Sequence, residues 1–280
     1  MNSQKDKKVF WLEKFDSFEL GGEDAKRFLN GMTTSNLNSH QNIFQTCWLT
    51  PKGGIRALLE IHFAHQRLIV IVLQGDANEI RNNFENMIFP SDRIELHNII
   101  SLFRLQEVDK VNSWRKFESK IFSKKDLNYY CHKHNISSME IDDLENWKIS
   151  NAFPQFPHEI DGLHNPLELG LTDLVDFNKG CYLGQETMAR LKKSSSLKQE
   201  IRFWIGNGLN NYAELKNKRI YFDNNKEKVV GYITSFVHLK TKEVKGLAMV
   251  KKVYLGENGP FYNEDLGKIR LKQSYSSVFL

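Results

Sequence analysis

The chain has 280 residues, of which 40% are hydrophobic and 26% are charged, and its formal net charge is +5. This composition is ordinary for a soluble globular protein, and no apolar run approaches the roughly 18 residues of a membrane helix. No signal-type apolar segment follows the polar residues 1–8, so we expect a cytoplasmic protein without a membrane partner. The modest charge does not by itself predict direct binding of nucleic acid. The cysteines Cys47, Cys131 and Cys181 are widely spaced and indicate neither a disulfide framework nor a Cys-x-x-Cys zinc site.

The first part of the chain mixes strand and helix signals. Two helices are predicted, a short one over 25–31 that starts near Asp24 and ends at Asn30-Gly31, and a second over 76–87 with apolar residues at steps of three and four. Strands are predicted over 9–12, 15–20, 44–49, 55–63, 67–73, 93–96 and 99–107. This order of elements predicts an α+β fold.

Residues 108–150 give weaker signals. We predict a helix over 111–122, a strand over 127–131 and a helix over 141–149 with Ser137 as its N-cap. On a strand, His132 and His134 would face one side beside Cys131, but the absence of a further nearby ligand disfavours a zinc site.

The charged and serine-rich residues 192–196 mark the clearest domain boundary, so we predict domains at 1–193 and 194–280. Turn residues then separate short apolar segments, which predicts a small β-barrel. The expected strands cover 200–205, 219–222, 229–236, 244–250 and 268–271.

The most specific pattern lies in residues 177–190, Phe-Asn-Lys-Gly-Cys-Tyr-Leu-Gly-Gln-Glu-Thr-Met-Ala-Arg. Gly180 and Gly184 permit a positive φ or a close backbone approach. Cys181 precedes a predicted helix and lies near Lys179, and both features favour a thiolate. The alternative is that Cys181 is a small buried apolar residue, because exposure decides reactivity.

The string Lys-Gly-Cys-Tyr-x-Gly-Gln-Glu at 179–186 resembles the signature of the YgfZ-type folate-binding proteins, relatives of the glycine-cleavage T-protein, an aminomethyltransferase. Weaker matches at 22–36, 50–53, 154–168 and 230–248 extend the resemblance over roughly residues 15–275. The resemblance implies an α+β, T-protein-like body of several lobes around a central folate pocket, with a small C-terminal β-barrel. Phe15, Trp147 and Tyr182 are candidate aromatic residues for that pocket, and core positions are the alternative for each.

The resemblance also implies a tetrahydrofolate-binding accessory protein for iron–sulfur cluster assembly or repair, which supports cluster-dependent enzymes including tRNA-modifying ones. Cys181 would be a transient iron ligand or a thiol-exchange residue, and Lys179 would stabilise its charge. One thiolate cannot hold a cluster alone, so a scaffold or carrier protein would share it. The implied folate contacts are Lys52, for the glutamate tail, together with Gly180, Tyr182, Gly184, Gln185, Glu186 and Arg190. The alternative for Lys52 is an exposed turn residue.

One departure from the resemblance concerns catalysis. In catalytic T-proteins an Asp-Asp pair follows the Gly-Gly-Ile turn, whereas Gly53-Gly54-Ile55-Arg56 is followed here by Ala57 and Leu58. Apolar side chains cannot act as acid, base or charge stabiliser, which argues against glycine cleavage and against an enzyme. The alternatives are a folate-dependent one-carbon (aminomethyl-type) transferase, a pure interaction protein and a direct tRNA binder.

Overall fold

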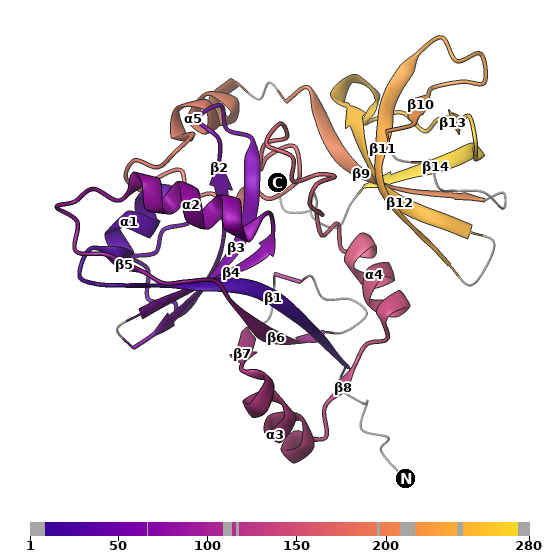
Figure 1. The fold of residues 1–280 in the computed structure, drawn as a ribbon. Coiled ribbons are helices and arrows are strands. Elements are labelled where there is room, and N and C mark those ends of the chain that lie inside the picture. The colour runs from indigo at the N-terminus through magenta and orange to yellow at the C-terminus, as the bar shows by residue number, and fades with distance from the viewer. Residues whose placement is uncertain are drawn as a thin grey trace.

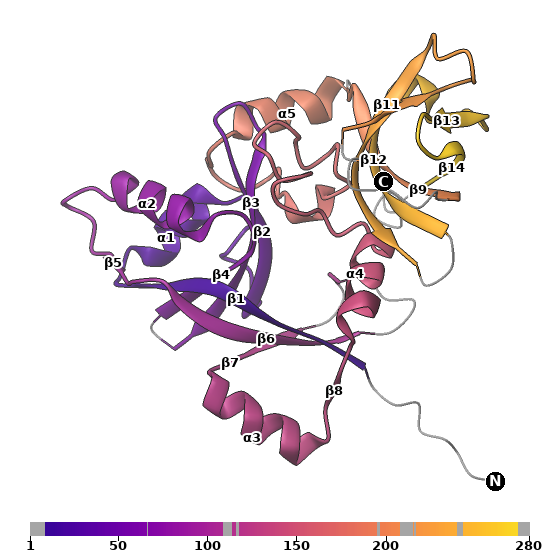
Figure 2. The same ribbon diagram turned by 45° about the vertical axis from the view of Figure 1, so that its right-hand side comes forward.

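The computed structural model describes residues 9–65, 67–108, 114–115, 118–194, 197–207, 215, 217–239 and 243–273. These residues form a large N-terminal sheet flanked by helices and a C-terminal β-barrel, with α4 lying between them (Figures 1 and 2). The predicted α+β class with a small C-terminal barrel is therefore confirmed. No helix within the described ranges is long and apolar enough to cross a membrane, and the cytoplasmic location stays a prediction.

The N-terminal sheet is built around β1, a long strand that was predicted as two. Glu13 and Lys14 continue the strand because they pair with Arg104 and Phe103 of the neighbouring β6. The strand order is β2 (Ile43–Leu49), β3 (Ile55–Ala64), β4 (Arg67–Gln74), β1 (Val9–Gly21), β6 (Ile100–Val108) and β7 (Ser119–Phe122). Two short strands, β5 (Glu95–Leu96) and β8 (Ser137–Ser138), pair with opposite ends of β1.

Each face of the sheet buries its own apolar cluster. Helices α1 (Ala25–Met32) and α2 (Ala77–Met87) cover one face, and α4 (Ile141–Ser150) packs on the other side (Figure 2). Side chains alternate along a strand, so Ala57 of β3 belongs to the cluster under α1 and α2, whereas Leu58 belongs to the opposite cluster. Helix α1 continues through the predicted stop at Asn30-Gly31 because Met32 is buried against the same cluster.

The predictions for residues 111–138 were largely wrong. Residues 119–122 form β7 rather than the end of a helix, and residues 111–113 and 116–117 lie outside the described ranges. Residues 127–131 belong to helix α3 (Lys124–His134), which starts at Ser123, whose hydroxyl accepts a hydrogen bond from the Asp126 amide. Leu127 alone is buried in α3, so the helix lacks the apolar periodicity that sequence reading relies on. Ser137 lies in β8, and the N-cap of α4 is Glu140.

These corrections also change the arrangement of the His pair. Residues two apart on a helix do not share a face, so His132 and His134 point in different directions. The described residues contain no group of three His, Cys, Asp or Glu side chains that could hold a metal ion.

The C-terminal barrel closes in the order β10-β11-β12-β9-β14-β13, around a core that includes Trp204 and Ile220. Sequence reading missed β13, which has only three residues. The barrel strands are β9 (Gln199–Asn207), β10 (Arg219–Tyr221), β11 (Val229–His238), β12 (Glu243–Lys251), β13 (Phe261–Asn263) and β14 (Gly267–Gln273). Helix α5 (Gln185–Ser194) and the short helices η1 (Thr172–Leu174) and η2 (Lys252–Tyr254) complete the fold. The predicted domain boundary at 193/194 falls in the last turn of α5, shortly before β9, and the division into two domains stays a prediction.

Buried polar contacts join the barrel to the body. The Ser235 hydroxyl donates to Oε1 of the fully buried Glu159 at 2.8 Å. His164 Nε2 lies 2.7 Å from the Tyr232 hydroxyl, and its Nδ1 lies 3.0 Å from Oδ1 of Asp161. Since these groups come from the loop after α4 and from β11, they hold the barrel in a defined position.

Candidate functional site

The signature residues 179–186 form a loop and the first turn of α5. Cys181 is exposed on this loop, as a reactive thiol must be, and the buried alternative is therefore wrong. Helix α5 starts at Gln185, which places Glu186 in its first turn, as expected from the sequence. A carboxylate there faces the positive end of the helix dipole.

Lys179 has different partners from those expected. Its side chain is buried, and Nζ donates hydrogen bonds to the carbonyl oxygens of Asn30 (2.6 Å), Thr33 (2.7 Å) and Ser35 (2.7 Å). Burial lowers the pKa of the ammonium group to about 8. An ammonium group has three N–H donors, and all three are directed at these carbonyls. Lys179 therefore ties the signature loop to the end of α1 and has no donor left for the Cys181 thiolate.

The two glycines of the signature differ in what they require. Gly184 has a φ of +84°, and a Cβ added there would lie 2.8 Å from the Thr50 carbonyl oxygen. Gly180 has an ordinary φ, and an added Cβ would meet no atom within 4 Å. Of these two residues, only Gly184 has a backbone conformation and a close contact that require glycine.

The Thr50–Gly53 turn packs on the start of α5. A Cβ added to Gly53 would lie 3.0 Å from Cγ2 of Thr187 and 3.1 Å from Cε of Met188. Lys52 is exposed on this turn. The structure therefore places the turn with Lys52 beside the signature helix, although the two are more than 130 residues apart in the sequence.

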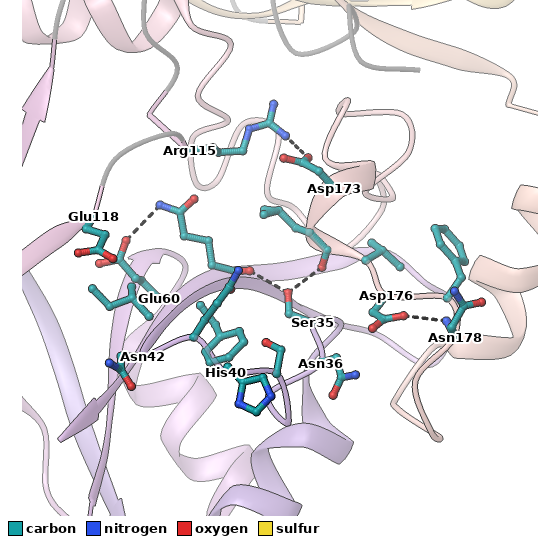
Figure 3. Close-up of a pocket in the computed structure, with 18 of the residues that line it drawn as sticks. Ser35, Asn36, His40, Asn42, Glu60, Arg115, Glu118, Asp173, Asp176 and Asn178 are labelled. Carbon is teal, nitrogen blue, oxygen red and sulfur yellow. Dashed lines mark hydrogen bonds and ion pairs between the residues drawn. The ribbon is translucent and has the colours of Figure 1, made fainter. Parts of the chain in front are cut away.

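A pocket of about 910 Å³ opens between β2 and residues 173–178 (Figure 3). Polar and charged side chains make up most of its wall, with carboxylates among them, and Phe44 and Phe177 add aromatic surface. The lining residues are Ser35, Asn36, Ser39, His40, Gln41, Asn42, Ile43, Phe44, Gln45, Glu60, Arg115, Glu118, Asp173, Leu174, Val175, Asp176, Phe177, Asn178 and Lys192.

The predicted folate contacts do not line this pocket. Helix α5 contributes Lys192 to it, rather than Arg190 or the residues of the 179–186 string. The candidate aromatic residues Phe15, Trp147 and Tyr182 are all buried in the core cluster on the α4 side of the sheet, which favours the core alternative for each. Sequence reading missed the pocket because its wall comes from five separate parts of the chain whose polar residues match no motif.

A buried ionic network forms the floor of the pocket. The Glu60 carboxylate receives two hydrogen bonds from Arg104, at 2.9 and 2.7 Å, and a further one from Gln45 at 3.1 Å. Burial opposes ionisation of Glu60, but Arg104 and His62 outweigh burial and hold the pKa of this carboxyl well below its usual range. Glu60 therefore stays negatively charged, and its charge is already balanced within the protein.

The cationic groups of the pocket lie at its edge. Arg115 forms an ion pair with Asp173 of η1, and the Lys192 ammonium group lies 4.1 Å from the centroid of the Phe177 ring. Asp176 Oδ1 accepts a hydrogen bond from the Asn178 amide at 2.8 Å, which shapes the wall opposite Glu60 (Figure 3). The pocket thus combines amide groups, aromatic surface, four carboxylates and two cations.

Comparisons with known proteins place the fold. No family model matches the chain. The crystal structure of glycine cleavage system aminomethyltransferase T from Bartonella henselae matches with a TM-score of 0.75 over 97% of this chain and 86% of that one, at 10% sequence identity. The chain therefore has the T-protein fold, as the signature implied.

A curated relative adds a second likeness. The chain is 24% identical over 238 residues to the Arabidopsis thaliana protein named "Putative transferase At1g60990, chloroplastic". The match covers 68% of this chain and 54% of the relative, so the chain spans about half the length of the curated protein it matches. The resemblance to YgfZ-type proteins rests on the signature string and stays a prediction.

Proposed function

We propose that this protein binds tetrahydrofolate and acts as an accessory protein in iron–sulfur cluster assembly or repair, supporting cluster-dependent enzymes that include tRNA-modifying ones. The observation that carries the proposal is the exposed thiol of Cys181 on a loop fixed by Lys179, within a T-protein fold. A soft thiolate suits iron, and exposure lets a partner protein reach it.

The position of the missing acidic pair supports a role other than glycine cleavage. Ala57 and Leu58 are both fully buried, and they lie in the two apolar clusters on opposite faces of the sheet. Neither side chain could be exchanged for a charged group without desolvating it. The chain thus has no carboxylate at the place where a catalytic T-protein carries one.

The residues of the pocket fit a folate. Its volume lies within the roughly 300–1,000 Å³ of small-molecule sites. Asn42 offers a side-chain amide to a pteridine edge, and Gln45, whose amide nitrogen donates to Glu60 and to the Trp114 carbonyl, offers its amide oxygen. Phe177 offers a ring face, and Arg115 and Lys192 offer cations for a carboxylate tail. Bound folate would supply a rigid ring and an anionic tail, and the protein's own residues would hold both.

The chemistry expected of Cys181 is a reversible metal–thiolate bond. The thiol loses its proton to water, the thiolate sulfur binds an iron atom of a cluster that is cargo, and the bond breaks when the cluster moves on. A scaffold or carrier protein must supply the other cluster ligands. We therefore propose such proteins and their client enzymes as partners.

A complementation experiment tests this function. Cells that lack the family member receive wild type, Cys181→Ala or the control Cys131→Ala, and the activity of a cluster-dependent tRNA-modifying enzyme is measured. Binding of 5-formyltetrahydrofolate by each purified protein is measured in parallel by calorimetry. We expect all three to bind folate and only Cys181→Ala to fail in cells. Full activity of Cys181→Ala would refute the thiol chemistry, and no folate binding by wild type would refute the folate site.

A one-carbon transferase is the second candidate, because the names of both similar proteins describe transferases. Conversion of tetrahydrofolate to a one-carbon derivative by the purified protein, without a partner, would favour it. The buried apolar pair Ala57 and Leu58 stands against it.

A further inference from the structure

Arg115 is held rigidly at the edge of the pocket. Its side chain is 10% exposed, and Nη1 donates a hydrogen bond to the Gly170 carbonyl oxygen at 3.3 Å. The guanidinium carbon lies 5.1 Å from the centroid of the ring of the fully buried Trp114. The Trp114 carbonyl in turn accepts a hydrogen bond from Gln106 of β6 at 2.8 Å. These contacts hold the guanidinium group in place independently of Asp173.

Asp173, the ionic partner of Arg115, is held much less firmly. Its side chain is 54% exposed and lies on η1 at the rim of the pocket (Figure 3). The Asp173 carboxylate is half in water and regains hydration when it turns away, whereas the largely buried Arg115 then needs another anion as its partner. The pair therefore combines a fixed cation with an exchangeable anion.

The other charges of the pocket favour the same place for an anionic group. Glu60, Glu118 and Asp176 also line the wall, and Figure 3 shows them away from the Arg115 side chain. A ligand carboxylate would be repelled at those points and attracted at Arg115. Burial lowers the pKa of the Arg115 guanidinium group and Asp173 opposes that lowering, so a carboxylate partner favours its charged form.

We propose that Arg115 binds the carboxylate tail of the ligand, and that Asp173 is a stand-in counter-ion that leaves when the tail arrives. The inference rests on the proposed function, because the tail in question is the glutamate of a folate. It assigns to Arg115 the role that the sequence suggested for Lys52, which does not line the pocket. A guanidinium group suits this exchange because it can bind a carboxylate through two parallel N–H donors.

The test compares two ligands on several variants. The ligands are 5-formyltetrahydrofolate and its α,γ-diamide, which has a similar size but lacks the tail charges. The ratio of their dissociation constants measures recognition of the tail in wild type, Arg115→Gln, Asp173→Asn, Lys192→Gln and the control Lys193→Gln. Lys193 is exposed on α5 and does not line the pocket.

The proposal gives opposite signs for the two partners. We expect wild type to prefer the diacid, Arg115→Gln to lose about tenfold to a hundredfold of that preference, and Asp173→Asn to gain a few fold because the competing carboxylate is gone. Affinity for the diamide should change little in either, and Lys193→Gln should behave as wild type.

Two results among the variants would overturn the proposal. The first is an unchanged ratio in Arg115→Gln, and it would assign the tail to Lys192 if Lys192→Gln loses the preference instead. The second is a lost preference in Asp173→Asn, which would make Asp173 an essential holder of Arg115. If wild type binds both ligands equally well, the tail is not recognised and only this inference fails. If wild type binds neither, the folate site itself is refuted and the inference falls with it.

Discussion

Replacing Gly184 by alanine should destabilise the protein by about 1–4 kcal/mol, whereas the same change at Gly180 should not. An alanine at a φ of +84° costs about 1–2 kcal/mol in backbone strain. Its Cβ would also lie 2.8 Å from the Thr50 carbonyl oxygen and 3.2 Å from Leu49 Cβ, and overpacking of this kind costs about 1–3 kcal/mol. The loss of unfolded-chain entropy returns about 0.4–1 kcal/mol.

Gly180→Ala is the matched control because it is the same substitution in the same loop. It should change the free energy of unfolding by less than about 0.5 kcal/mol or stabilise slightly, since its Cβ meets nothing within 4 Å. Urea denaturation followed by circular dichroism measures both variants. Equal effects at the two glycines would refute the reasoning, because the signature would then need glycine for a reason other than backbone geometry.

Other predictions concern buried charges. Lys179→Met should cost about 2–4 kcal/mol of unfolding free energy, because it leaves three carbonyls without their donor. If Lys179 served the thiolate instead, stability would change little and alkylation of Cys181 would shift to higher pH. Glu60→Gln should cost about 3–5 kcal/mol by leaving Arg104 buried without a counter-ion, and Arg104→Met added to it should restore part of the loss in urea melts. His164→Gln should destabilise in a pH-dependent way. Burial opposes the charge of His164, but Asp161 outweighs it and raises the pKa above 6.5. The stabilisation is therefore complete below pH 6.5 and is lost as the pH rises through the folded pKa, so the gap between wild type and variant in denaturation midpoints should be larger near about pH 5.5 than near about pH 8.5. A gap that widens with pH would contradict this sign.

The fold class and most strands could be predicted from the sequence because alternation and turn residues mark them locally. β2, β3 and β4 agree with prediction to within a residue or so at their ends. Helix α3 could not be predicted, since Leu127 is its one buried residue and its Tyr129-Tyr130 pair resembles a strand. The N-cap at Ser123 and the contact with β7 help to fix this helix, and neither produces a periodic pattern of apolar residues in the sequence.

Some features of the candidate site could likewise be predicted from the sequence, and others could not. The signature marked Cys181 and the start of α5, because those residues are contiguous in sequence. The pocket, the partners of Lys179 and the pairing of Arg115 with Asp173 depend on segments that meet only after folding. Sequence spacing carries no information on such contacts. Lys179 is an example. Its place two residues before Cys181 suggested that it stabilises the thiolate, whereas in the structure its ammonium group donates to backbone carbonyls near the end of α1.

The short segment from 173 to 183 links the pocket to the thiol. Asp176 and Asn178 line the pocket. The next residue, Lys179, donates hydrogen bonds to carbonyl oxygens at the end of α1, and the Leu183 backbone amide donates to the Gly31 carbonyl oxygen at 3.2 Å. A ligand that fills the pocket would brace this segment from one side while α1 holds it from the other. Under the proposed function, tetrahydrofolate would then position Cys181 without donating a carbon. Binding a cofactor for its shape, in a fold that has apolar residues where the catalytic acids would lie, is consistent with an accessory role.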